Sequence, residues 1–449
     1  STQFSIDSRS LQEGDMFIAL TGEQVDGHLF VNQVLQAGAV GCIIAADRKH
    51  VLDTIDPELL RSKLIIVVPD TLNALFRLAS AWRAQFSYPV IGITGSVGKT
   101  STKEVLAHIL TAHGKKVIAS FGNQNTKIGL SLNILRMRST HDVAVFEMGI
   151  SKRGEMAELA QLVRPTTAII TCIGHQHMDG LGSLNDIALE KRDIFKYFTE
   201  ESIGIINGDQ SILAHVSYSH PVVKFGSKTT NQVQARKINP DGSSIHFSLK
   251  LYKNKYTITL DRPHVGAVFN CLAAATAAHL LDVSHDTIVA AIQNAPEVSG
   301  RFEQRPLKKV RGIVINDCYN ANPESMKAAL LALESIKTSA QKIAVLGDML
   351  GLGVNSPFWH RQLGRFLRKV PSLKQVILVG NLVKWTEDWL PNGISATRVA
   401  TWQEAVEVLE KQLGAESLVL VKGSLAVGLG NLVQEISVDK KIKKLQVSP

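Results

Sequence analysis

The chain has 449 residues, of which 45% are hydrophobic and 20% charged, as is ordinary for a soluble globular protein of about two to four domains. No apolar run is long enough to cross a membrane and no signal peptide is visible, so we expect a cytoplasmic protein without a membrane span; four widely spaced cysteines exclude a disulfide scaffold. The formal net charge of +9 is modest for this length, and an anionic small substrate explains it as well as nucleic acid does. Basic residues cluster only in the run 440–444, so we expect no nucleic-acid partner.

Residues 1–88 are predicted to form a first α/β domain, because apolar strand-like runs alternate with helical patterns. The predicted strands cover 15–20, 41–45 and 63–68, and the predicted helices cover 31–39 and 72–84. Tyr88-Pro89 marks the end of this domain, since proline disfavours a helical residue before it.

Residues 89–300 are predicted to form a second domain, which opens with a candidate phosphate-binding loop. The β-branched run 90–94 leads into the segment Thr94-Gly95-Ser96-Val97-Gly98-Lys99-Thr100-Ser101, and a helical pattern follows as far as Leu110. In such a loop the backbone N–H groups cradle phosphates, the lysine reaches the outer phosphates and the threonine hydroxyl can hold Mg²⁺. The usual pattern G-x-x-x-x-G-K-[ST] is missed at Ile93, so a tight turn with a surface lysine remains an alternative.

The rest of the second domain and a third domain, residues 301–449, continue the α/β pattern. Second-domain strands are predicted at 117–119, 142–146, 167–172 and 202–206, followed by an antiparallel excursion over 222–260 and an alanine-rich helix over 271–281. Third-domain strands are predicted at 312–315, 342–346, 375–379 and 417–421, as in a doubly wound, Rossmann-like sheet. The predicted fold is therefore three α/β domains with mostly parallel sheets.

Polar residues follow many of these strands, at the sheet edge where open parallel sheets bind ligands. They are Glu147, His177, Asp209, Asp317, Asp348 and Lys422. Solvated turns would also place polar residues there, so the position alone decides nothing. Glu147 could complete a magnesium site beside Thr100, or it could be a surface acid. His175 and His177 are two residues apart, which is not the spacing of helical zinc ligands, and Lys191 lies in a helical pattern where a lysine is ordinarily solvated.

Several segments resemble the Mur ligase family, in order and over essentially the whole chain. Thr94–Thr100 has the family's T-G-x-x-G-K-T form, which accounts for the mismatch at Ile93. The other matching segments are Asp7-Ser8-Arg9, Asn123-Gln124-Asn125, Glu147-Met148-Gly149, Asn207-Gly208-Asp209, Asp317-Cys318-Tyr319-Asn320-Ala321-Asn322-Pro323, Gly347-Asp348-Met349 and Lys422-Gly423-Ser424. The segment beginning at Asp317 is similar to that of the members that add D-alanyl-D-alanine.

The resemblance implies a UDP-substrate domain, an ATPase domain and a C-terminal domain that closes over ATP. It implies an ADP-forming amide ligase of peptidoglycan precursor synthesis, which joins D-alanyl-D-alanine to UDP-MurNAc-tripeptide through an acyl phosphate. ATP and Mg²⁺ would be its cofactors, and we expect a monomer. A sibling Mur ligase, a folylpolyglutamate synthase and a catalytically degenerate nucleotide-binding protein remain alternatives.

The resemblance also implies roles for individual residues. Lys99 would hold the β- and γ-phosphates, Thr100 and Glu147 the first Mg²⁺, and His177 a second metal with Lys191, which would be carbamylated. Arg301 would neutralise phosphate charge, Asp317 would bind the ribose, and Asn270 and Asn322 would lie near the adenosine. Ser8 and Arg9 would contact the uridine nucleotide, and Asn125 the substrate.

Five places depart from the family pattern. Asn125-Thr126 stands where Asn-Asn is frequent, and Ser131 where proline is frequent. Gly266-Ala267 stands where a His-Asn pair is usual, with His264 nearby. Gly351-Leu352-Gly353 replaces Glu-Leu-Gly, and Leu425 replaces an arginine.

Overall fold

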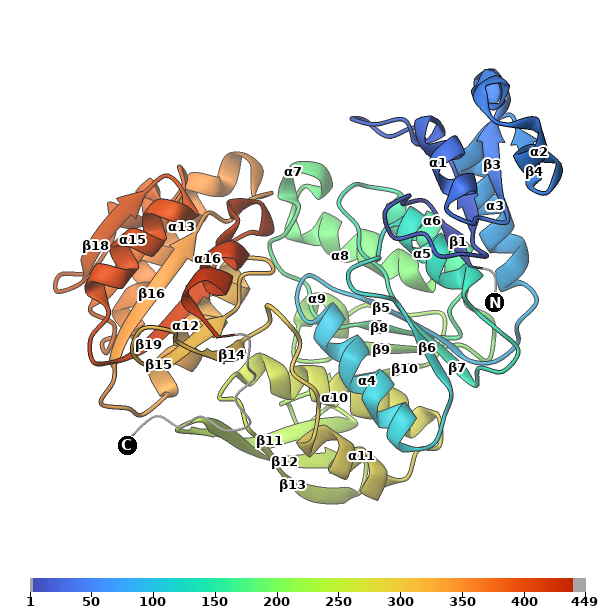
Figure 1. Ribbon diagram of the computed structural model, residues 1–449. Helices are drawn as coiled ribbons and strands as arrows, with labels where there is room; N and C mark the ends of the chain where they lie inside the picture. The colour runs from blue at the N-terminus through green and yellow to red at the C-terminus, as the bar shows by residue number, and fades with distance from the viewer. Residues whose placement is uncertain (1–2, 439–449) are drawn as a thin grey trace.

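Three β-sheets follow one another along the chain in the computed structural model, which describes residues 3–438 (Figure 1). The sheets have four, nine and six strands, and the predicted three-domain α/β fold is confirmed. The boundaries at 88/89 and 300/301 stay predictions, and the basic run 440–444 lies outside the described residues. Within residues 3–438, no helix combines the length and apolar character needed to span a membrane.

The first sheet is parallel, in the order β1-β2-β3-β4. The three predicted strands are confirmed, and the short β1 is an addition to them. The strands are β1 (Phe4–Ser5), β2 (Met16–Ile18), β3 (Gly41–Ala45) and β4 (Leu64–Val68). The helices are α1 (Val31–Gln36), α2 (Pro57–Arg61) and α3 (Thr71–Arg83), with 3₁₀ turns η1 (Gly27–Phe30) and η2 (Ala46–Thr54).

The central sheet has the order β13-β12-β11-β10-β9-β8-β5-β7-β6 and is parallel from β6 to β11. Its strands are β5 (Val90–Thr94), β6 (Val117–Ala119), β7 (Val143–Glu147), β8 (Thr167–Ile170), β9 (Ile203–Asn207), β10 (Val222–Gly226), β11 (Val233–Asp241), β12 (Ser244–Leu251) and β13 (Asn254–Leu260). Only β11, β12 and β13 pair antiparallel.

The antiparallel excursion predicted from residue 222 therefore begins one strand too early. β10 pairs parallel with β11 through a short connection, which the carboxylate of Asp209 holds together. Asp209 accepts hydrogen bonds from the backbone N–H groups of Ser227 and Lys228 and from the side chain of Asn231. A side chain outside the segment thus stabilises the short crossover, and the alternation within the segment does not reveal it.

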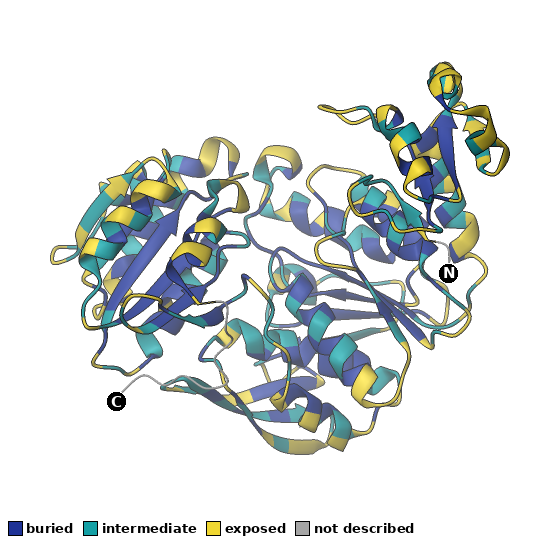
Figure 2. Cartoon of the chain, viewed as in Figure 1, coloured by how far each residue is buried: buried dark blue, intermediate teal, exposed yellow. Residues whose placement is uncertain are grey.

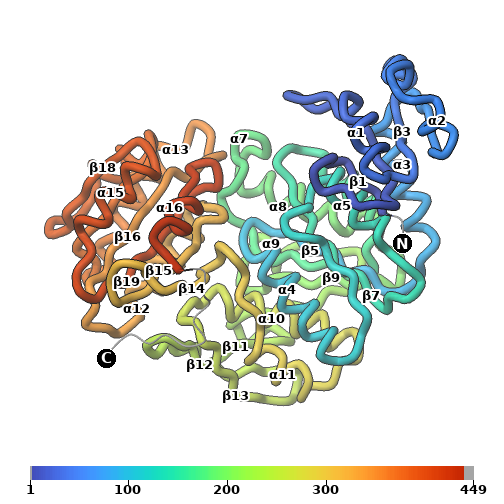
Figure 3. Tube along the Cα trace, in the orientation of Figure 1, coloured from blue at the N-terminus to red at the C-terminus, as the bar shows by residue number. Residues whose placement is uncertain are grey.

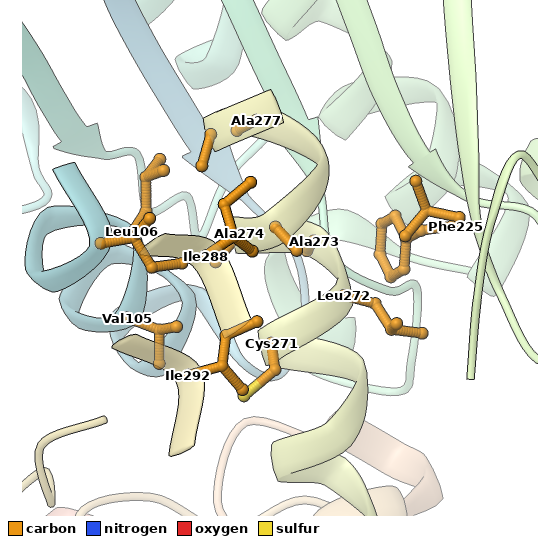
Figure 4. Close-up of a cluster of buried hydrophobic side chains, with 14 of the residues drawn as sticks. Val105, Leu106, Phe225, Cys271, Leu272, Ala273, Ala274, Ala277, Ile288 and Ile292 are labelled. Atoms are coloured by element: carbon orange, nitrogen blue, oxygen red, sulfur yellow. The ribbon is translucent and has the colours of Figure 1, made fainter. Parts of the chain in front are cut away.

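The central helices cover both faces of this sheet and place the phosphate loop. They are α4 (Lys99–Ala112), α5 (Lys127–Leu135), α6 (Glu155–Val163), α7 (Met178–Leu181), α8 (Leu184–Arg192), α9 (Ser211–Ala214), α10 (Val265–Leu280) and α11 (His285–Gln293), with the 3₁₀ turn η3 (Asp193–Phe195). Val105 and Leu106 of α4 pack against alanines of α10 and isoleucines of α11 (Figure 4). Because alanine is small, α10 approaches α4 closely. The predicted helix 271–281 is longer than expected, since it begins at Val265.

The third sheet has the order β14-β15-β19-β16-β17-β18 and is parallel except for β14. Its strands are β14 (Glu303–Pro306), β15 (Arg311–Asn316), β16 (Gln341–Gly347), β17 (Gln375–Val379), β18 (Ser395–Val399) and β19 (Glu416–Lys422). The helices are α12 (Pro323–Ser335), α13 (Ser356–Phe366), α14 (Lys384–Glu387), α15 (Trp402–Gln412) and α16 (Leu429–Ile436), with 3₁₀ turns η4 (Gly353–Asn355), η5 (Leu367–Lys369) and η6 (Leu425–Val427).

The four strands predicted for the third domain are confirmed, whereas β14 and β18 were not predicted. Both lie at edges of the sheet, and their polar sequences lack a strand-like apolar run. The central strands are buried while the outer helix faces are exposed, as Figure 2 makes visible. The first and third units flank the central one on opposite sides (Figure 3).

Arg83, at the end of α3, fixes the first unit against the central one. Its buried guanidinium donates to the carbonyl oxygens of Val163 (2.7 Å), Arg164 (2.9 Å) and Phe86 (2.7 Å). Burial lowers the pKa of this guanidinium. The three acceptors replace the water that the group loses on burial.

Arg83→Met is expected to lower the free energy of unfolding by about 2–4 kcal/mol, because the carbonyl oxygens of Val163, Arg164 and Phe86 lose the buried guanidinium that donates to them. Thermal or urea unfolding followed by circular dichroism measures the change. Arg77→Met, on the exposed side of the same helix, is the matched control and should stay within about 0.5 kcal/mol of the parent chain. Equal unfolding midpoints for Arg83→Met and the parent chain would contradict this role.

Candidate functional site at the phosphate loop

The loop between β5 and α4 has a shape that requires glycine at two positions. Gly95 and Gly98 have φ angles of 148° and 91°, in the region that side chains disfavour. A Cβ atom at position 98 would lie 2.3 Å from Oδ1 of Asn270, and one at position 95 would lie 1.9 Å from Oγ1 of Thr171. The loop backbone is therefore pressed against α10 and against the end of β8, with no room for side chains.

Hydrogen bonds from neighbouring segments hold this loop. The Ser96 hydroxyl donates to the carbonyl oxygen of Gly174 and accepts from its N–H, each at 2.9 Å. Thr171 donates to the carbonyl oxygen of Val97 at 2.6 Å. Lys99 Nζ donates to the carbonyl oxygen of Gly95 at 2.8 Å, and burial lowers the pKa of Lys99. The result is a preorganised anion cradle at a helix N-terminus, as the sequence predicts.

Two cavities, of about 290 and about 440 Å³, adjoin the loop. Both are lined by the loop residues 96–98, by Arg301 and by Asn320. The phosphate loop and the Arg301 guanidinium thus form a wall that the two cavities share. A group transferred at this wall can pass from a molecule in one cavity to a molecule in the other.

The first cavity contains the predicted Asp317 and an ion pair that holds it. Asp317 Oδ2 lies 2.7 Å from Nζ of Lys422, which is 2% exposed. Lys422 also donates to the carbonyl oxygens of Asp317 and Asn320. Asn322 lines the same cavity, but its side-chain oxygen accepts from the N–H of Ser325 and caps α12. This asparagine is therefore the N-cap residue of α12.

His264 also lines the first cavity, although the sequence singled it out only as a neighbour of a missing His-Asn pair. It is the N-cap residue of α10, and its ring packs on Phe302 with centroids 5.0 Å apart. A Cβ atom at Gly266 would lie 2.5 Å from Cε1 of His264. The imidazole thus occupies the space that a side chain at position 266 would need. Burial lowers the pKa of His264, which favours the neutral ring.

Glu147, in the second cavity, has one carboxylate oxygen without a partner. The side chain is 1% exposed, and Oε1 accepts from Nδ2 of Asn125 at 2.8 Å. Among residues 3–438 nothing hydrogen-bonds to Oε2. A buried carboxylate oxygen without a donor is costly, so this atom fits a cation. The surface-acid alternative for Glu147 is wrong.

The donors around Glu147 suit magnesium better than zinc. Oxygen donors are available from Glu147 and from the hydroxyl of Thr100, which accepts from Nη2 of Arg301 at 3.2 Å. No group of three or more His, Cys, Asp or Glu side chains in the described part of the chain could hold a metal ion by itself. A magnesium ion here would therefore complete its shell with water and phosphate oxygens, as is usual for this ion.

The Arg301 guanidinium is oriented by an aromatic ring. Its central carbon lies 4.2 Å from the centre of the Tyr319 ring, and Nε lacks a hydrogen-bond partner among the described residues. A planar cation held in this way presents its remaining donors to both cavities. Tyr319 was not predicted as a site residue. Its position within the Asp317–Pro323 segment, which was singled out from the sequence, is the signal that could have identified it.

His177 and Lys191 are the two remaining residues predicted to serve a metal. His177 lines this cavity, and burial together with Lys99 and Lys191 lowers its pKa. Lys191 is 2% exposed, and burial, reinforced by Lys99, lowers its pKa to about 7. The expectation that a helix lysine is solvated is therefore wrong for Lys191. Near neutral pH much of this side chain is a neutral amine.

Other predicted residues lie elsewhere or serve the fold. Ser8 and Arg9 belong to the first unit and line neither cavity; Arg9 is exposed and pairs with Asp7. Asp348 accepts three backbone hydrogen bonds from residues 381–383, so it is a turn residue, as is Asp209. Asn270 and Ser101 line the first cavity, and Asn125 lines the second.

Comparison with known proteins gives consistent matches over the chain. Residues 2–83 match the Mur ligase family, catalytic domain; residues 93–278 match the Mur ligase middle domain; and residues 300–425 match the Mur ligase, glutamate ligase domain. UDP-N-acetylmuramoyl-tripeptide--D-alanyl-D-alanine ligase of Bacillus subtilis (strain 168) is 32% identical over 96% of this chain and 92% of its own length.

Solved structures agree with the sequence matches. MurF from Acinetobacter baumannii superposes with a TM-score of 0.83 at 30% identity, covering 96% of this chain and 92% of that one. MurF ligase from Thermotoga maritima, in complex with ADP, superposes with a TM-score of 0.82 at 27% identity, covering 96% of both chains.

Lys191→Met is expected to stabilise the protein more at pH 7 than at pH 9. The lysine titrates near pH 7 when folded and near 10.5 when unfolded, so the unfolded chain binds the extra proton between these values and stability of the parent chain rises with pH. The variant lacks this dependence on pH. The amount by which its free energy of unfolding exceeds that of the parent chain should therefore fall by about 2 kcal/mol between pH 7 and pH 9. Urea unfolding in buffer free of carbon dioxide measures it. An advantage that is the same at both pH values would contradict the lowered pKa.

Proposed function

The chain belongs to the Mur ligase family, and we propose that it joins D-alanyl-D-alanine to UDP-MurNAc-tripeptide with cleavage of ATP to ADP and phosphate. The observation that carries this proposal is the wall of phosphate loop and Arg301 between two cavities, with the unpartnered oxygen of Glu147 beside it. One cavity then takes the nucleotide and the other takes the carboxylate that receives the phosphoryl group.

ATP is proposed to enter the first cavity with its phosphates on the loop. Lys99, whose ammonium already lies against the loop, would neutralise the β- and γ-phosphates. Asp317 would meet the ribose and Asn270 and Asn322 would lie near the adenosine, since all three line this cavity. The ADP named for the Thermotoga maritima relative is consistent with this assignment.

Thr100 and Glu147 would hold a magnesium ion beside the phosphates, and His177 with Lys191 would serve a second metal. When bound, such ions neutralise charge on the phosphate oxygens. The residues fit this role because Oε2 of Glu147 has no donor among residues 3–438 and the Thr100 hydroxyl lies at the start of α4. Lys191 would be carbamylated, since a neutral lysine amine reacts with carbon dioxide and becomes a carboxylate.

The proposed reaction occurs in two steps at the wall. An oxygen of the tripeptide's terminal carboxylate attacks the γ-phosphorus, the bond to the bridging oxygen breaks, and ADP leaves. The amine of D-alanyl-D-alanine then attacks the acyl carbon, loses a proton to solvent or base, and expels phosphate as the carbon–oxygen bond breaks. Lys99 and Arg301 face the charge that the transfer develops, so the protein contributes positioning and electrostatics.

The uridine nucleotide is proposed to bind the first unit through Ser8 and Arg9. Arg9 is exposed, so its charge is accessible to a diphosphate. The tripeptide would extend from there to the second cavity, where Asn125 lies. We further propose a cytoplasmic location, since Cys42, Cys172, Cys271 and Cys318 are free thiols. A monomer is proposed as well.

The alternatives have less support. For a sibling ligase or a folylpolyglutamate synthase, the Asp317–Pro323 segment would be expected to differ. For a degenerate nucleotide-binding protein, the residues that face the γ-phosphate would be free to change, yet Lys99, Thr100, Glu147 and Arg301 all remain and contact one another or the shared wall.

Phosphate release tests the proposal directly. ATP cleavage should require UDP-MurNAc-tripeptide, and steady turnover should require D-alanyl-D-alanine as well, because the acyl phosphate needs an amine to continue. A coupled phosphate assay with each substrate omitted in turn measures this. ATP cleavage that needs neither the tripeptide nor the acceptor would contradict the ligase proposal.

Lys191→Ala is expected to lower the rate by about 10–100-fold, because a carboxylate beside the second metal is lost. Added formate or acetate should restore part of the rate, since the variant leaves space for a small carboxylate. Lys196→Ala, a few residues further on and exposed, is the control and should keep full activity. ¹³C NMR with labelled bicarbonate should give a carbamate signal only where Lys191 is present. Unchanged activity in Lys191→Ala would rule the carbamate out.

A further inference from the structure

The segment of residues 173–182, between β8 and α8, is held by the third unit at several points. This segment carries His177, which lines the second cavity. The contacts come from three different places in the third unit: the first turn of α12, the helix α13 and the loop after β16. Figure 1 places α7, which begins in this segment, at the border with the third unit.

Glu324 of α12 holds His175 with both carboxylate oxygens. Oε1 lies 2.6 Å from Nδ1 of the ring, and Oε2 accepts from the backbone N–H at 3.2 Å. The imidazole ring also packs on the ring of Trp359, with centroids 4.2 Å apart. Gly174 permits this approach, since a Cβ atom there would lie 3.0 Å from the carboxylate of Glu324.

Gly351 contacts Met178, the residue that follows His177. Its carbonyl oxygen accepts from the N–H of Met178 at 2.9 Å, and its φ angle is 72°. A residue with a side chain would adopt this angle only with strain of about 1 kcal/mol or more. The glycine that replaces the family's usual glutamate therefore lets the loop reach Met178 without this strain. Gly353, with φ of 56°, packs on Asp179 nearby.

His177 itself has a strained backbone between these two anchors. Its φ angle is 52°, in the left-handed region that costs a non-glycine residue about 1 kcal/mol or more. Such a conformation persists only when the surroundings fix it. The hydrogen bond from the N–H of Met178 to Gly351 and the two hydrogen bonds between His175 and Glu324 fix the residues on either side.

We infer that the third unit positions His177 through Glu324 and Gly351, which makes Glu324, His175 and Gly351 positioning residues for the reaction at the second cavity. Because Glu324 also lines the first cavity, the same contact ties the placement of His177 to the nucleotide side of the wall. The role given to His177 rests on the proposed function, whereas the coupling itself rests on the contacts.

Hydrogen exchange in the protein without ligands tests the coupling. Glu324→Gln keeps the size of the side chain but weakens the bonds to His175, and the amides of residues 175–178 should exchange about tenfold faster. Glu334→Gln is the matched control, because this glutamate lies in the same helix and bonds to Ser372 within the third unit. Gly351→Ala is a second variant and should also speed exchange at Met178. Unchanged exchange in both variants would overturn the inference.

Steady-state kinetics supply the second readout. Glu324→Gln should lower kcat by about tenfold, and Glu334→Gln should change neither kcat nor the KM for ATP. A rise in KM alone would contradict a positioning role for His177. The exchange experiment uses no substrates, so its result does not depend on the ligase proposal. If the ligase proposal is wrong, the parent chain itself will show no turnover that depends on D-alanyl-D-alanine.

Discussion

The close packing of the phosphate loop against its neighbours is the constraint on which the site depends. Residues 95 and 98 have no side chains, and the space beside them is filled by Thr171 and Asn270. The alanine-rich α10 brings Asn270 to this point, and its packing on α4 belongs to the largest core of the central unit. The loop is therefore fixed before any phosphate arrives, so binding requires little reorganisation.

Basic side chains close to this loop bear on what the site can bind. Lys99 lies near Arg301 and near the carboxylate of Glu147, and Lys191 lies near Lys99. The pKa values of both lysines are lowered by burial, which means that each ammonium lacks enough negative charge nearby. A polyphosphate with its cations supplies that charge. In the proposed reaction, the shared wall would place the outermost phosphate where a carboxylate in the other cavity can reach it.

The sequence predicts the strands and helices that have a local apolar pattern. It misses the features that depend on contacts between segments far apart in the chain. β5, the loop and Glu147 are predicted because a buried parallel strand and its polar end are local patterns. β18 is missed because an edge strand need not be apolar. The burial of Lys191 and the pairing of His175 with Glu324 arise from tertiary packing, which no local pattern records. Asp348 resembles a site residue in sequence but only closes a turn.

The central claim is that the γ-phosphoryl group crosses the wall to a carboxylate, and oxygen labelling tests it most directly. UDP-MurNAc-tripeptide with ¹⁸O in its terminal carboxylate would be turned over with ATP and D-alanyl-D-alanine, and the released phosphate examined by mass spectrometry. An acyl phosphate requires one ¹⁸O atom from the carboxylate to leave with the phosphate. Phosphate whose new oxygen comes only from water would contradict the account.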